Sequence, residues 1–327
     1  MVLFSSSRRF FLGSIGWTGL TLSAACGKAQ AVREDAAIVA SRSPAATMVD
    51  ATPSTPSVSL PPYSLEADVR ERIDAARREV DGSSAPVQVV GGLYVFVAVD
   101  RGGPLFDEAV RVANEGLPLL LSGGRFDKRP DRAVTVYAYS SEERYFEACK
   151  KRLGTKTCDT PFGRYVMDGR FIIANLSRGV HTCLHEMVHS IVQTDAPMTP
   201  AYLDEGIGAL MEQPKFDPPG EIHGDTNWRL PDLKQHLDAV RLEDLFTMTD
   251  AQFRSPKGLL LREAEARYLC KWLDDQGLLW HFYRAVRDSA ANDPHGALSF
   301  NNVVGETPAE AQRAWRTWVR RLRFEGQ

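Results

Sequence analysis

Residues 181–189 of this 327-residue chain read HTCLHEMVH, and the last five letters follow the pattern His-Glu-x-x-His. They lie in a run of helical apolar spacing from Gly179 to about Thr194, which predicts a buried helix. Residues four apart on a helix share one face, so His185 and His189 can point their ring nitrogens at one ion. The spacing therefore predicts a metal site on this helix.

Zinc suits these donors, because imidazole nitrogens bind it at about 2.0 to 2.1 Å. Glu186 is rotated about 100° from His185 around the helix, so it can reach a water on the ion without becoming a ligand. That position suits a general base. A catalytic zinc still needs a third protein ligand and an open position for water. The alternative is a buried helix whose His and Glu side chains are satisfied by hydrogen bonds alone.

Glu205 follows His189 by sixteen positions, within YLDEGIGA (202–209). Together the two segments resemble the gluzincin metallopeptidases, and particularly the bacterial peptidase MA-like group. In that family an aromatic-Leu-x-Glu-Gly segment opens the helix after HExxH, and its Glu completes the zinc site. The resemblance, which covers about residues 171–212, implies one Zn²⁺ held by His185, His189 and Glu205, with Glu186 activating the water.

The sequence departs from fuller family patterns in two respects. Ala209 stands four residues after Glu205 where an Asp would be expected, so acidic partners of the His ligands must come from elsewhere, with Asp204 and Asp195 as candidates. No HExxHxxGxxH continuation follows, which excludes a third His ligand of the metzincin kind. The family also places a strand before the active-site helix, and its edge receives an extended substrate; GRFIIANLS (169–177) stands there.

Transition-state stabilisation in gluzincins often comes from a downstream Tyr, His or Arg. By that resemblance Tyr268 is the best catalytic candidate, and a plain core position is its alternative. His181 is expected at the helix start or in a pocket wall. His223, Trp228 and Arg229 are candidates for lining the cleft, with a solvated loop as the alternative for His223.

Strands and helices alternate ahead of the HEMVH segment. Helices are predicted over 65–80, 106–123 and 142–154, and strands over 87–100 (one strand, or two around Gly91-Gly92), 133–141 and 169–177. A second helix over 200–214, a loop over 215–232 and mostly helices beyond it follow. The pattern predicts an α+β fold with a small N-terminal sheet, an active-site helix and a mostly α-helical C-terminal half. The resemblance implies that this fold is zincin-like.

The N-terminus, residues 1–26, has the features of an export signal. Ser7-Arg8-Arg9-Phe10-Phe11-Leu12 resembles a bacterial twin-arginine signal, and the uncharged stretch Phe10–Ala25 is short for a membrane span of about 20 residues. Small residues before Cys26 resemble a lipoprotein signal in which that Cys is acylated. Ala29-Gln30-Ala31 offers a competing cleavage site, but we favour lipidation.

This signal predicts an exported protein of the periplasm or cell envelope, attached to a membrane only through its lipid. Residues 27–62 are dominated by Ala, Ser, Thr and Pro, which predicts a flexible tether. The folded domain is expected over 63–327, with the sheet and active-site helix up to about 195 and a helical part over 200–327. A net charge of −3 argues against a nucleic-acid partner.

Export makes disulfides possible, and four cysteines remain if Cys26 carries lipid. Cys149 and Cys158 bracket a short loop and are expected to form a local bridge. Cys183 and Cys270 lie in apolar helical patterns, where a second bridge and two buried free thiols are equally open.

The reading that unites these features is a zinc metallopeptidase acting on a peptide or protein substrate through a metal-activated water. Two alternatives stay open. One is a catalytically inactive envelope scaffold or binding lipoprotein that keeps zinc for structure. The other is a zinc amidase acting on a cell-wall component.

Overall fold

The computed structural model describes residues 62–80, 85–100, 102–154 and 160–324. The expected export signal with Cys26, and the expected tether up to residue 61, lie outside these residues. The expected mixture of helices with a small sheet in the N-terminal half is confirmed, and the described part of the chain after residue 230 contains helices but no strand.

Five strands form one mixed sheet in the order β1-β2-β3-β5-β4. They are β1 (Val87–Val90), β2 (Tyr94–Ala98), β3 (Val134–Tyr139), β4 (Gly163–Val166) and β5 (Phe171–Asn175). The central strands β2, β3 and β5 are parallel, and each edge strand runs antiparallel to its neighbour. The central strands are nearly continuous apolar runs, as expected of strands covered on both faces.

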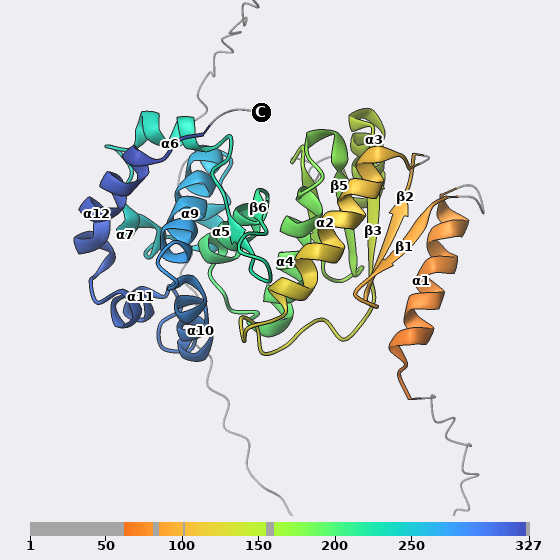
Figure 1. The fold of residues 1–327 in the computed structure, drawn as a ribbon, viewed down its shortest axis with the longest axis horizontal. Helices are drawn as coiled ribbons and strands as arrows, with labels where there is room; N and C mark the ends of the chain where they lie inside the picture. The colour runs from red at the N-terminus through yellow and green to blue at the C-terminus, as the bar shows by residue number, and fades with distance from the viewer. Residues whose placement is uncertain (1–61, 81–84, 101, 155–159, 325–327) are drawn as a thin grey trace, which may run out of the picture. The chain divides into compact units, whose positions relative to one another are not determined.

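Helices cover both faces of the sheet (Figure 1). One apolar cluster joins one face to α1 (Leu65–Glu79) and α3 (Glu142–Leu153). The other face belongs to the main core, together with α2 (Pro104–Leu120) and α4 (Thr182–Asp195). The HEMVH helix α4 is therefore backed by the sheet, and its remaining face is turned toward the C-terminal helices.

The C-terminal half is built around α9 (Leu259–Asp274). This helix contacts α5 (Ala201–Leu210), α6 (Leu230–His236), α7 (Leu242–Leu245), α10 (Leu279–Ser289) and α12 (Pro308–Arg321). The remaining elements are η1 (Leu176–Arg178), β6 (Pro214–Lys215), β7 (His223–Gly224), α8 (Asp250–Phe253) and α11 (Ala297–Val304). Because α9 packs on α5 and α5 packs on α4, the HEMVH helix is fixed from both halves.

Most of the predicted elements are present, with a few differences. Two strands flank Gly91-Gly92, whose positive φ values make the turn that only glycine adopts easily. The expected loop over 215–232 contains β7, which pairs with β6 in a separate two-stranded sheet, and the start of α6. Strand β4 was not predicted at all. Among the described helices, none has both the length and the apolar character needed to cross a membrane.

Candidate metal centre

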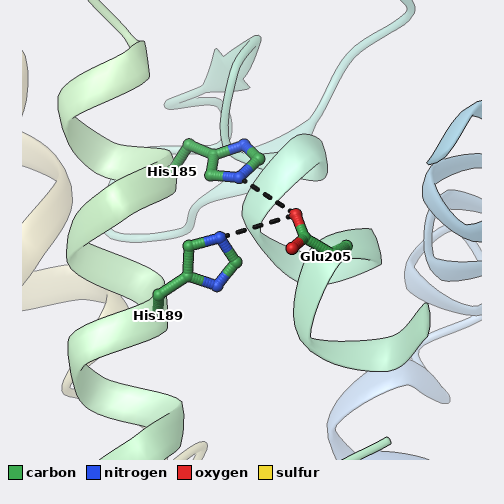
Figure 2. Close-up of side chains that lie close together, drawn as sticks. All are labelled: His185, His189 and Glu205. Carbon is green, nitrogen blue, oxygen red and sulfur yellow. Dashed lines mark ion pairs between the residues drawn. The ribbon is translucent and has the colours of Figure 1, made fainter. Parts of the chain in front are cut away.

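The sequence-predicted ligands come together between α4 and α5. His185 and His189 project from successive turns of α4 toward Glu205 on α5 (Figure 2). Their Nε2 atoms lie 3.5 and 3.6 Å from Glu205 Oε2. Within the described residues, this is the group of His, Cys, Asp or Glu side chains whose ligand atoms could hold a metal ion.

These distances fit a zinc ion. Ligand atoms placed tetrahedrally at about 2.0 to 2.1 Å from zinc are separated from one another by roughly 3.3 to 3.4 Å. The two Nε2–Oε2 separations are within a few tenths of an ångström of that value, so small side-chain adjustments suffice. Two imidazoles and one carboxylate are also a donor set that zinc accepts in catalytic sites.

Each histidine is oriented by a carboxylate on its other nitrogen. Glu212 Oε1 lies 3.0 Å from His185 Nδ1, and Asp204 Oδ1 lies 2.8 Å from His189 Nδ1. A neutral ring that donates from Nδ1 presents the lone pair of Nε2, so in the neutral rings these carboxylates favour the tautomer that a metal needs. Asp204 was one of the two acidic partners considered from the sequence. The other, Asp195, accepts a hydrogen bond from Tyr283 instead.

Glu212 was not predicted as part of the site. It lies just beyond the end of α5, seven residues after Glu205, and two helical turns place such residues on one face. That spacing is the signal that could have found it. Its other oxygen is ion-paired with the buried Arg229, which also lies 3.3 Å from Glu263. Arg229 therefore supports Glu212, the carboxylate that orients His185, and does not simply line the cleft.

The charges at the centre follow from this burial and pairing. Burial disfavours charge on Glu205, but His189 and His185 outweigh it and hold its pKa well below the ordinary value. Burial also acts against charge on His185, but Glu205 and Glu212 raise its pKa to about 9. Each carboxylate and imidazole of the centre therefore stabilises the charged form of its neighbours.

Glu186 lies beside the ligands and is only 5% exposed. Its Oε2 accepts a hydrogen bond of 2.7 Å from the backbone N–H of Tyr165 on β4. A Cβ atom on Gly163 would lie 3.0 Å from Glu186 Oε1, so the strand approaches closely because this position has no side chain. Burial raises the pKa of Glu186 above its ordinary value, which makes its carboxylate a stronger base.

The strand beside the candidate base is β4, and this corrects the expectation for GRFIIANLS. That segment forms β5, which is paired with β3 on one side and β4 on the other, so its edge is covered. The signal for β4 was present in the sequence. Asp168-Gly169 stands between two short apolar segments, and Asp-Gly is a strong hairpin turn signal.

Tyr268 lies in the core, as its alternative reading had it. Its side chain is 0% exposed. Its hydroxyl accepts a 3.0 Å hydrogen bond from the backbone N–H of Asn227 and lies 3.3 Å from the carbonyl of the same residue. A phenol committed to backbone groups and shielded from solvent holds the loop before α6, so we assign it no catalytic role.

The other candidates lie outside the ligand cluster. His181 stands at the start of α4, near Glu108 and Arg111. His223 interacts with Glu221 and Asp274. Trp228 is exposed at 44% and stacks on Phe162, the residue before β4, at a ring-centroid distance of 5.6 Å.

The cysteines divide into two groups. Cys183 and Cys270 are buried free thiols, so no bridge joins them. Cys149 is disulfide-bonded. Its expected partner Cys158 lies outside the described residues, and that pairing stays a prediction.

Two glycines of the EGIG segment allow the helices to meet. A Cβ on Gly206 would lie 2.7 Å from Cys270 Sγ and 2.8 Å from the carbonyl oxygen of Ala266, both on α9. A Cβ on Gly208 would lie 3.1 Å from the ring of His185. The first glycine allows the two helices to pack closely, and the second leaves room for the ring of His185.

No protein-family model matches the chain, and no curated protein matches it significantly.

Proposed function

We propose that the protein is a zinc metallopeptidase of the gluzincin kind with a zincin-like fold, in which His185, His189 and Glu205 hold one Zn²⁺. The observation that carries this proposal is the convergence of two Nε2 atoms on Glu205 Oε2 at 3.5 and 3.6 Å, with both Nδ1 atoms engaged by carboxylates. When bound, zinc would polarise a substrate carbonyl and lower the pKa of a water molecule.

Glu186 is the proposed general base. The backbone N–H of Tyr165 fixes one of its oxygens, and its burial strengthens it as a proton acceptor. It would take a proton from the attacking water and pass that proton to the leaving amine as the peptide bond breaks. A single carboxylate serves both steps because it is protonated after the first.

An extended peptide is the substrate class favoured by the surroundings of Glu186. Strand β4 is an edge strand, paired with β5 on one side only. The carbonyl of Phe162 accepts from Asn175 of β5, whereas the N–H of Tyr165 faces Glu186, so backbone groups alternate between the sheet and the centre. The N–H of Tyr165 is already held by Glu186, but a peptide can add to the other outward-facing backbone groups of this edge, which would bring its carbonyl groups near the centre.

The first test is the metal content of the full-length protein after reconstitution with zinc. We expect about one zinc per chain, lost or greatly weakened in His189→Ala and Glu205→Ala. His236→Ala, which removes a half-exposed histidine on α6, is the matched control and should keep the metal. A well-folded wild-type protein without zinc would exclude the metal centre.

The second test separates a peptidase from a zinc scaffold and from a cell-wall amidase. Glu186→Gln should abolish hydrolysis of a mixed peptide library while zinc stays bound, because the amide cannot accept the proton. Persistent hydrolysis in this variant would refute the role of Glu186. Zinc binding with neither cleavage nor binding of a hydroxamate would favour the scaffold, and cleavage of muropeptides alone would favour the amidase.

For the N-terminus we infer a twin-arginine export signal with lipidation at Cys26, which would tether the protein to a membrane in the cell envelope. Mass spectrometry of the mature N-terminal peptide tests this. An acylated Cys26 is the expected result, whereas an unmodified terminus at Val32 would show cleavage after Ala31 instead.

A further inference from the structure

Glu205 has a charged partner of its own, on the oxygen that faces away from the histidines. Its Oε2 lies near His185 and His189, and its Oε1 accepts a hydrogen bond of 2.5 Å from Nη1 of Arg254. The three proposed ligands are therefore matched one to one with charged side chains, Glu212 and Asp204 on the histidines and Arg254 on the carboxylate.

The segment that carries Arg254 is fixed by two sets of contacts. Asp250, in α8, accepts a 2.9 Å hydrogen bond from the backbone N–H of Ala201 and so ties α8 to the start of α5. Arg262 on α9 then donates to three backbone carbonyl oxygens, which belong to Phe253, Ser255 and Lys257. The backbone on both sides of Arg254 is therefore held to α5, which carries Glu205, and to α9.

The pair is asymmetric in its exposure. The side chain of Glu205 is 14% exposed, and that of Arg254 is 51% exposed. Water screens the charge of a half-exposed arginine, so its electrostatic effect on the centre is weakened. Its directional effect is not weakened, because a charge-assisted hydrogen bond fixes the plane of the carboxylate. With Oε1 engaged, Oε2 is the oxygen left to face the two Nε2 atoms.

We propose that Arg254 is a positioning residue that orients Glu205 for metal binding and restricts it to one-oxygen ligation. The inference rests on the proposed zinc centre. Its consequence for the site is that a coordination position stays free for water, which a carboxylate binding through both oxygens would occupy.

The test compares Arg254→Ala and Arg254→Lys in the full-length protein, with Arg313→Ala as an exposed control on α12. Zinc affinity is measured by competition with a chromophoric chelator. We expect Arg254→Ala to bind zinc about tenfold more weakly, as for other partners of metal ligands. Arg254→Lys should lie between it and the wild type, because an ammonium group keeps one donor but loses the planar fork.

A second readout detects the geometry of the centre. In the Co²⁺-substituted protein, the visible absorption spectrum reports the number and arrangement of ligands, and we expect it to change in Arg254→Ala. An ion pair that only stabilised the fold would lower the melting temperature of the metal-free protein and leave this spectrum as it is. Arg262→Ala should show a smaller change of the same kind, because it loosens the segment but keeps Arg254.

The outcomes distinguish the two proposals. Unchanged zinc affinity and an unchanged cobalt spectrum in Arg254→Ala would overturn the positioning role while the zinc centre stands. Tighter binding in Arg254→Ala would also overturn it, because relief of charge repulsion would then outweigh orientation. A wild-type protein that binds neither zinc nor cobalt would overturn the metal centre, and this role with it.

Discussion

Asp204 and Glu205 are neighbours in the chain but contact different ring nitrogens of the same histidine, His189. Consecutive residues on a helix differ by about 100° in direction, so Asp204 reaches His189 Nδ1 while Glu205 faces His189 Nε2. The two carboxylates therefore contact the two ring nitrogens of His189. On α5 the proposed ligand Glu205 directly follows Asp204, the residue that orients His189.

Asp204→Asn should lower zinc affinity about tenfold or more while the protein stays folded. The amide matches the carboxylate in size, but a neutral acceptor holds the His189 N–H more weakly. Chelator competition measures the change, and Asp232→Asn on α6, whose side chain is about half exposed, is the control. An affinity equal to that of the wild type would show that the contact does not support the site.

Gly208→Ala should weaken zinc binding without loss of stability. The new methyl group would lie 3.1 Å from the His185 ring, and this ring must move to accommodate it. Alanine is the better helix former by roughly 1 kcal/mol, so the fold itself should not suffer. Zinc affinity and the melting temperature of the metal-free protein are the two measurements. A lower melting temperature with unchanged affinity would contradict this account.

Among the elements, α5 is the one on which the centre depends most. It lies between α4, which carries the two histidines, and α9, which occupies the middle of the helical half. Its contact with α9 is close because Gly206 brings the two backbones together without a side chain between them. The position of Glu205 is therefore determined by packing on the opposite side of its own helix.

Gly206→Ala should destabilise the metal-free protein by roughly 1 to 3 kcal/mol, the usual cost of an overpacked contact. The methyl group would meet a sulfur atom and a carbonyl oxygen, and the carbonyl cannot move without the backbone of α9. Thermal unfolding should show a drop of roughly 2 to 4 °C for each kcal/mol. Gly208→Ala on the same helix is the comparison, and equal melting temperatures would contradict the packing argument.

The elements also show how far the sequence could predict the centre. His185, Glu186 and His189 follow from helical spacing, and Glu205 from a resemblance in its short segment. The structure brings the two histidines and Glu205 together (Figure 2), and Glu186 lies on the same helix as the histidines. Arg254 could not be found in this way, because it lies 49 positions from Glu205 and meets it only through tertiary packing. Strand β4 has only four residues, too few for a clear alternation of apolar and polar positions, so its signal in the sequence is the Asp168-Gly169 turn that follows it.

At the scale of the whole domain, the two halves meet at the centre. The sheet supports α4 and supplies the N–H of Tyr165, and the helical half supplies Glu205, Arg229 and Arg254. A ligand bound by residues from both halves stabilises the folded state as a whole, because the unfolded chain cannot bind it as well.

Zinc should therefore raise the melting temperature of the protein. At a free concentration of one hundred times its dissociation constant, zinc adds about 2.7 kcal/mol to the free energy of unfolding. For a domain of this size, that corresponds to a rise of roughly 5 to 10 °C. Scanning calorimetry with and without zinc measures it, and His189→Ala should show no rise. A similar rise in that variant would mean that zinc binds elsewhere.

Stability should also depend on pH through His223. Burial lowers its pKa, but the carboxylates of Glu221 and Asp274 outweigh burial and raise the pKa above the ordinary value. The stabilisation is fully present below the unfolded-state pKa of about 6.5, and it is lost as the pH rises through the higher folded-state pKa. The melting-temperature difference between wild type and His223→Gln should be larger at pH 6 than at pH 9; a constant difference would exclude this contribution.

The closeness of the ligands along the chain has a consequence for biosynthesis. His185 and Glu205 are twenty positions apart, so closing the loop between them costs little chain entropy. A ribosome completes all three ligands before it reaches Arg229, Arg254 and Glu263. On the proposed function, a zinc ion captured by the nascent chain is held by ligands that still lack part of their support. On this argument we expect it to exchange readily until α8 and α9 have folded against α5, and to be retained by the finished protein.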